Sequence, residues 1–114
     1  MAEAITGAVK RANATSTAYE ASRVVKASPG VCYGLTGYNS KGSSQWIQLH
    51  DSAALPADTA VPAVILTVAT VGNFSIDFGV YGRAFTNGIV ICNSSTGPTK
   101  TIGSADCWFD VQYA

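Results

Sequence analysis

Hydrophobic and polar residues alternate along most of the chain, the pattern of strands that pack one face on a core. The segment SQWIQLHD, residues 44–51, shows the alternation well. Ile47 and Leu49 fall on one face of this segment, and Trp46 and His50 fall on the other. The segment is therefore predicted to be a strand whose Ile47 and Leu49 face the core.

Further strands are predicted between turn residues, at residues 19–25, 31–36, 73–78, 88–93 and 105–113. Phe74, Ile76 and Phe78 are predicted to face the core, as is the face of residues 105–113 that carries Phe109 and Val111, opposite Trp108. The segment AVILTVAT, residues 63–70, is an unbroken apolar run rich in β-branched residues. Such a run predicts a strand that is buried on both faces. The glycines of GVYGRAFTNG, residues 79–88, predict a bend.

Short strands separated by turns about every ten residues predict an all-β fold. We expect an antiparallel β-sandwich or jelly roll of about seven or eight strands. Residues 1–18 are small and polar with weak periodicity, so they are predicted to form an N-terminal arm or tail. Residues 19–114 are predicted to form a single β-sandwich domain, because 114 residues suit one domain.

Charge is scarce in this chain, since only 12% of its residues are charged and the net charge is zero. Soluble domains average about a quarter charged residues. A surface without a positive patch argues against nucleic acid or an anionic membrane as a partner. We expect Ser, Thr, Asn and Gly to cover the surface, or other protein molecules to cover much of it.

The three cysteines, Cys32, Cys92 and Cys107, form no close pair in the sequence. An odd number without metal-ligand spacing predicts reduced thiols that pack as small apolar groups. One disulfide plus a free thiol is the alternative. The scattered aspartates lack the spacing of a calcium loop. We therefore expect no metal and no cofactor.

His50 is the only histidine and precedes Asp51 directly. Adjacent side chains of a strand point to opposite faces, so the pair is not expected to act as a base and its orienting acid. A loop conformation there would allow a small hydrolase, which is the enzymatic alternative. A thiol–imidazole pair of Cys92 and His50 is disfavoured because Cys92 lies in an apolar strand. The chain is predicted not to be an enzyme, with His50 structural or at a subunit contact.

Tryptophan is costly to leave in water, and both Trp46 and Trp108 fall opposite the predicted core residues. Outward aromatic residues are enriched at protein contacts. The predicted interface residues are Tyr38, Trp46, His50 and Trp108. The alternative is that both faces of the sheet are buried within one monomer.

A family resemblance runs through YGLTGYN, SQWIQLHDS, LPADTAVPAVIL and FTNGIVICNSST, from about residue 31 to 113. In this order the segments resemble small virion proteins of tailed bacteriophages. The resemblance implies a β-sandwich structural protein of the phage particle, made in the host cytoplasm and located on the capsid surface. It implies a decoration or cement protein that binds the major capsid protein across subunits. It implies no catalytic residues.

Two non-enzymatic functions are thus expected from the sequence. The first is a self-associating capsid protein, expected to be a homotrimer, with residues 1–18 as an arm on a neighbour. The second is a carbohydrate-binding or tail-associated adhesion module, in which Trp46 and Trp108 stack on sugar rings.

Overall fold

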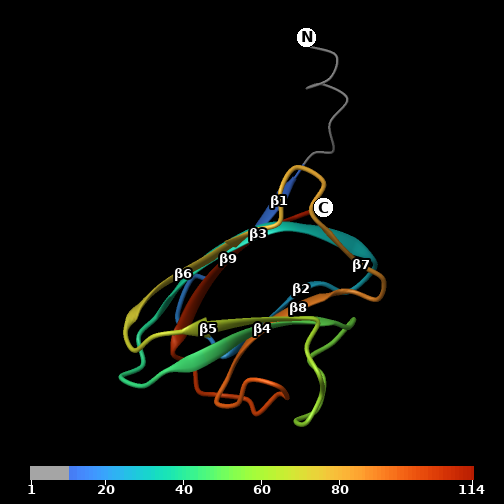
Figure 1. The fold of residues 1–114 in the computed structure, drawn as a ribbon. Helices are drawn as coiled ribbons and strands as arrows, with labels where there is room; N and C mark the ends of the chain where they lie inside the picture. The colour runs from blue at the N-terminus through green and yellow to red at the C-terminus, as the bar shows by residue number, and fades with distance from the viewer. Residues whose placement is uncertain (1–10) are drawn as a thin grey trace.

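The computed structural model describes residues 11–114, and their regular secondary structure is entirely β (Figure 1). The strands are β1 (Ala12–Thr15), β2 (Ser22–Lys26), β3 (Gly30–Asn39), β4 (Gln45–Asp51), β5 (Val64–Val68), β6 (Gly72–Asp77), β7 (Arg83–Phe85), β8 (Ile89–Ser94) and β9 (Cys107–Tyr113). They form two antiparallel sheets. Sheet A has the order β1-β9-β3-β6, with β7 also paired to β3, and sheet B has the order β2-β8-β4-β5.

The two sheets pack face to face as a β-sandwich, with the hydrophobic core between them. The predicted all-β class is therefore confirmed. The described strands number nine, where seven or eight were expected. The additional strands are short: β1 lies within the predicted arm, and β7 lies within the predicted bend. Residues 1–10 of that arm lie outside the described residues, and the division of the chain at residue 18 stays a prediction.

Aromatic rings fill the core around a glycine of β3. Gly37 is the register partner of Phe74 on β6 and of Phe109 on β9. The two rings approach each other with centroids 6.2 Å apart. A Cβ atom at Gly37 would lie 2.2 Å from the Phe74 ring, so glycine alone allows this packing.

The predicted core faces of β4, β6 and β9 are confirmed. Ile47 and Leu49 are buried, as are Phe74 and Phe109. Each fully buried side chain of this size stabilises the fold by roughly 1.5–3 kcal/mol relative to exposure. The alternation of the sequence thus located the inner face of the sandwich correctly.

The apolar segment 63–70 is not buried on both faces, and that prediction is wrong. Its strand β5 lies at an edge of sheet B, with Ile65 44% exposed. The doubly buried strand is β8, all six of whose residues are buried. An apolar run therefore does not show whether a strand lies at the centre or at the edge of a sheet.

Two loops cover the outer face of sheet B beside β8. One joins β4 to β5 and the other joins β8 to β9. Their backbones bond to each other, since Thr59 N–H donates to the Lys100 carbonyl at 2.7 Å and Lys100 N–H donates to the Ala60 carbonyl at 2.8 Å. No helix within residues 11–114 has the length and apolar character needed to span a membrane.

Candidate functional site

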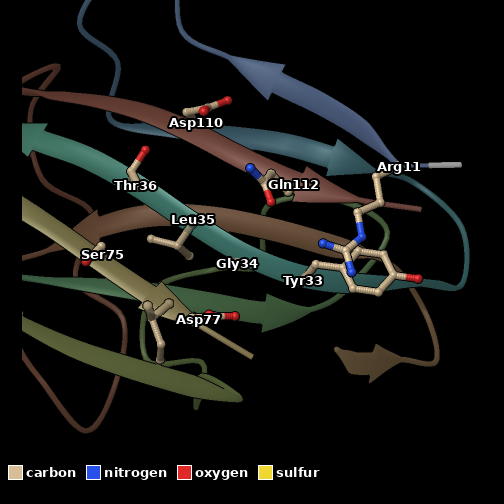
Figure 2. A pocket seen from close by; sticks show the side chains of 10 residues that line it. Arg11, Tyr33, Gly34, Leu35, Thr36, Ser75, Asp77, Asp110 and Gln112 are labelled. Atoms are coloured by element: carbon tan, nitrogen blue, oxygen red, sulfur yellow. The ribbon is translucent and has the colours of Figure 1, made fainter. Parts of the chain in front are cut away.

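The outer face of sheet A carries ordered rows of side chains, because register partners on neighbouring strands share a face. Each row takes one residue from β6, one from β3 and one from β9. The rows are Asn73–Tyr38–Trp108, Ser75–Thr36–Asp110 and Asp77–Gly34–Gln112. Figure 2 shows part of this face, where Ser75, Thr36, Asp110 and Gln112 come from neighbouring strands.

A groove of about 290 Å³ lies on this face. Its position follows from Gly34, which has no side chain between Asp77 and Gln112. Arg11 and Tyr33 lie at one end, where the guanidinium carbon is 3.9 Å from the centroid of the tyrosine ring (Figure 2). This cation–π contact positions Arg11 at the groove.

The two carboxylates of the groove are each held by one hydrogen bond. Thr15 Oγ1 donates to Asp110 Oδ1 at 2.8 Å, and Gly79 N–H donates to Asp77 Oδ1 at 2.8 Å. Each carboxylate therefore has its second oxygen directed at no hydrogen-bond donor of residues 11–114. The two acids are placed by the chain and retain capacity to accept from a ligand.

Three further polar side chains of the groove, Thr36, Ser75 and Gln112, are exposed. Within the described part of the chain they make no side-chain hydrogen bond. Two hydroxyls and an amide can both donate and accept. The groove thus presents mixed hydrogen-bonding groups rather than charge of one sign.

Next to the groove lies an aromatic patch, formed by Tyr19, Tyr38 and Trp108 around a hollow of about 390 Å³. Tyr38 and Trp108 are register partners. Tyr19 comes from the segment between β1 and β2, which is held by Glu20 N–H donating to the Cys107 carbonyl at 2.7 Å. Tyr19 remains 52% exposed.

The predicted interface residues do not form one surface. Tyr38 and Trp108 lie together on sheet A, whereas Trp46 lies on the outer face of sheet B. Trp46 is half-buried because Gly97 of the β8–β9 loop packs on it: a Cβ there would lie 2.8 Å from Trp46 Nε1. No pattern in the sequence indicated that this loop folds back over the strand.

His50 is 2% exposed and therefore presents little surface to a partner. Its Nε2 lies 3.0 Å from Gln48 Oε1. The Gln48 Nε2 group donates to the carbonyls of Thr96, Gly97 and Thr99. Desolvation lowers the pKa of His50, and the nearby Lys100 charge lowers it further.

The side chains of His50 and Asp51 contact different parts of the structure, so their expected divergence is confirmed. The Asp51 carboxylate accepts hydrogen bonds from the backbone N–H groups of Thr86, Asn87 and Gly88 and from the Thr86 hydroxyl. These bonds, that of Asn87 first, lower the pKa of Asp51. Asp51 thus fixes the turn between β7 and β8.

Lys100 is buried on the outer face of sheet B, a feature that the sequence did not reveal. It is 2% exposed, and its Nζ donates to Asp58 Oδ1 at 2.6 Å. This bond lowers the pKa of Asp58. A buried ammonium needs such a partner, so the pair holds the two covering loops together.

The three cysteines are free and buried, as predicted. Burial raises the pKa of Cys32 to about 11 and that of Cys92 to about 12, and it also raises the pKa of Cys107. Thiols with such pKa values are poor nucleophiles at neutral pH. Within residues 11–114, no cluster of three or more His, Cys, Asp or Glu side chains is placed to hold a metal.

Comparison with known proteins gave no matching family model and no matching curated protein. A solved structure with a similar arrangement of strands is the coat protein of Tobacco streak virus. It is 15% identical to this chain, with a TM-score of 0.44, over 89% of this chain and 85% of the coat protein. At this similarity the likeness says nothing of what the present chain does.

Proposed function

We propose that this chain is a non-enzymatic structural component of a tailed-phage particle, a decoration or cement protein on the capsid surface. In this proposal it associates with copies of itself as a trimer and binds across subunits of the major capsid protein. The resemblance of residues 31–113 to small phage virion proteins supports the assignment to a particle. The open edge of β5 is the observation that carries the association.

β5 has the properties of an edge that accepts another strand. Among the described strands it pairs only with β4, without a register shift. Ile65 is 44% exposed, and Val61 just before the strand is 77% exposed. Residues 59–76 contain no charged side chain. Charges, prolines and bulges are the features that normally prevent strand addition, and β5 has none of them.

The opposite edge of the same sheet is protected. β2 carries Arg23 and Lys26, and its register shifts between Val24 and Lys26. Charged side chains and an irregular register both oppose pairing with another strand. Sheet B therefore has one edge that opposes strand addition, the closed edge at β2, and one that allows it, the open edge at β5. A partner is expected at the open edge.

A strand of a neighbouring copy or of a capsid subunit would extend sheet B at β5. Such pairing satisfies the free backbone groups and covers Ile65 and Val61 without desolvating any charge of β5. In a ring of three copies, the β5 edge of every molecule contacts the same surface of the next molecule. Tyr38 and Trp108 lie on the other sheet and remain available for a second contact.

The test is sedimentation of the purified protein with two matched variants. Ile65→Lys places a charge on the open edge, and Val24→Lys places one on the closed edge at an equally exposed position (44% and 45%). We expect a trimer for the wild type and for Val24→Lys, and a monomer for Ile65→Lys. A wild type that stays monomeric at every concentration, or two variants that behave alike, would contradict the proposal.

Binding to the particle is tested with capsids of the phage that encodes the chain. Wild type and Val24→Lys are expected to co-sediment with the capsids, and Ile65→Lys is expected to bind much more weakly. Circular dichroism of each variant shows whether the fold is retained. Equal binding by a folded Ile65→Lys variant would assign the capsid contact to another surface.

A further inference from the structure

The groove and the aromatic patch of sheet A form one continuous surface. The row with Tyr38 and Trp108 is followed along β3 and β9 by the row with Thr36 and Asp110, and then by the hollow at Gly34. Four residues of a strand span about 14 Å. The surface therefore extends beyond the size of a single six-membered ring and suits an elongated ligand.

The chemistry of this surface suits hydroxyl groups. The second oxygens of Asp77 and Asp110 can accept hydrogen bonds, and Thr36, Ser75 and Gln112 can both donate and accept. A hydroxyl group needs both kinds of partner, because it donates one hydrogen bond and accepts others. The rings of Tyr38 and Trp108 add apolar faces on which a sugar ring can stack.

The charge of the groove argues against anionic ligands. Among the described residues that line the groove, two carboxylates, Asp77 and Asp110, face one cation, Arg11. Arg11 is already placed over Tyr33, and its Nη2 lies 3.4 Å from the Val80 carbonyl. A phosphate or an acidic sugar would meet a net negative site, so a neutral ligand is favoured.

The backbone argues against a peptide in the groove. Peptides usually bind sheets by adding a strand at an edge. Here β3 forms the floor, and it is paired with β9 on one side and with β6 on the other. A peptide chain would find no free backbone groups on this floor, whereas a saccharide binds through side chains.

From these observations we infer that the outer face of sheet A binds a neutral oligosaccharide. One sugar ring stacks on Trp108 and Tyr38 in the aromatic patch. The next rings extend over Thr36 and Asp110 toward Gln112, where the groove lies. Trp46 has no part in this site, because it lies on the outer face of the other sheet.

The site is separate from the β5 edge of the proposed function, so a result that contradicts one proposal does not contradict the other. A decoration protein joined to its neighbours through sheet B has sheet A left to face outward. Each copy then binds a glycan weakly through this site, and the many copies on one particle together bind a glycan-bearing surface more strongly.

The experiment screens wild-type protein on immobilised neutral oligosaccharides of glucose, mannose, galactose, xylose and N-acetylglucosamine, with sialylated and sulfated glycans as the charged set. Hits are measured by calorimetry, and their site is mapped from amide chemical shifts. We expect at least one neutral oligosaccharide to bind, with shifts at Trp108, Asp110 and Gln112. We expect the monosaccharide to bind more weakly than the oligosaccharide.

The variants Trp108→Ala and Gln112→Ala are each expected to weaken binding about tenfold or more. Gln112 is exposed, so its variant keeps the test valid if Trp108→Ala does not fold. Thr67→Ala, exposed on β5 of the other sheet, is the matched control and is expected to bind like wild type. Ile65→Lys is also expected to keep the wild-type affinity per site in calorimetry, whatever its association state.

Several results would overturn the inference. These are binding of charged glycans alone, shifts that map to sheet B, equal affinity of wild type and Gln112→Ala, or no response to the whole neutral panel. Loss of capsid binding in a folded Trp108→Ala variant, together with no glycan binding by the wild type, would assign the aromatic patch to a protein contact instead.

Discussion

Gln48 determines the state of two neighbouring side chains on the outer face of sheet B. Its Nε2 group donates to three backbone carbonyls, which directs Oε1 toward His50 and Cys92. An amide oxygen only accepts, so His50 must carry its proton on Nε2 and donate. The same oxygen lies 4.0 Å from Cys92 Sγ, and Gln48 thus stands between the thiol and the imidazole.

His50 is therefore expected to make the stability of the fold depend on pH. Its pKa is lowered in the folded state by desolvation and by Lys100, while the unfolded chain has a pKa of about 6.5. Below that value the unfolded state binds more protons than the folded state. The free energy of unfolding should thus be constant above about pH 7 and fall as the pH decreases below about 6.5, until the lowered pKa of the folded state is reached. Urea unfolding at a series of pH values measures this.

The matched variant is His50→Gln, whose amide can donate to Gln48 but does not titrate. It should unfold with a free energy that is flat over the same pH range. Asp51 and Asp58 also have lowered pKa values, but they lose their contribution only at more acidic pH, below the usual carboxyl value. A slope that persists in His50→Gln would show that another group is responsible.

The turn between β7 and β8 is held by one carboxylate at the end of β4. Asp51 Oδ1 accepts from Asn87 N–H at 2.8 Å, and Asp51 Oδ2 accepts from the N–H and the hydroxyl of Thr86. The turn contains Gly88, where a Cβ would lie 2.4 Å from the Ser52 carbonyl. The turn thus packs closely on the end of β4, which brings β8 into the sheet.

We expect Asp51→Asn to loosen this turn, because the amide replaces one acceptor by a donor that faces N–H groups. The melting temperature should fall, and the amide protons of Asn87 and Gly88 should exchange faster with solvent. Asp106→Asn is the control, since the Asp106 side chain makes no hydrogen bond within the described part of the chain. Unchanged exchange at Asn87 in a folded Asp51→Asn protein would remove this role from the carboxylate.

The sequence predicted the strands and their inner faces well, but it could not predict which strands pair with each other. Alternation in β4 and β9 identified the core residues, because period two is a local property of a strand. In β3 the register shift between Cys32 and Gly34 breaks that period, and both Cys32 and Leu35 reach the core. A bulge depends on the partner strand, which alternation does not show.

The candidate site was predictable only in part for the same reason. Trp108 was predicted to be an outward aromatic residue and Tyr38 a contact residue, and the structure places them side by side. The groove beside them depends on Gly34 lying between β6 and β9, which only the register reveals. His50 and Trp46 were assigned to the surface because nothing in the sequence shows that the loops around Thr59 and Lys100 cover sheet B.

At the scale of the whole molecule, the two sheets have different surroundings. Within residues 11–114, loops cover the outer face of sheet B and leave its β5 edge open, whereas no segment covers the outer face of sheet A. Only 12% of the residues are charged, and the net charge is zero. Association through β5 would thus rely on backbone hydrogen bonds and apolar contact rather than on ion pairs.

Self-association is therefore expected to depend little on salt. Screening weakens interactions between exposed charges, with a Debye length of about 10 Å at 0.1 M ionic strength. Because residues 59–76 carry no charge, the dissociation constant should change by less than about threefold between about 0.05 M and 0.5 M NaCl. Sedimentation equilibrium at both salt concentrations measures it. Ile65→Lys should stay monomeric at both, because screening does not remove the cost of burying its ammonium. Dissociation of the wild type at high salt would instead place ion pairs at the contact and move it from β5 to the charged edge at β2.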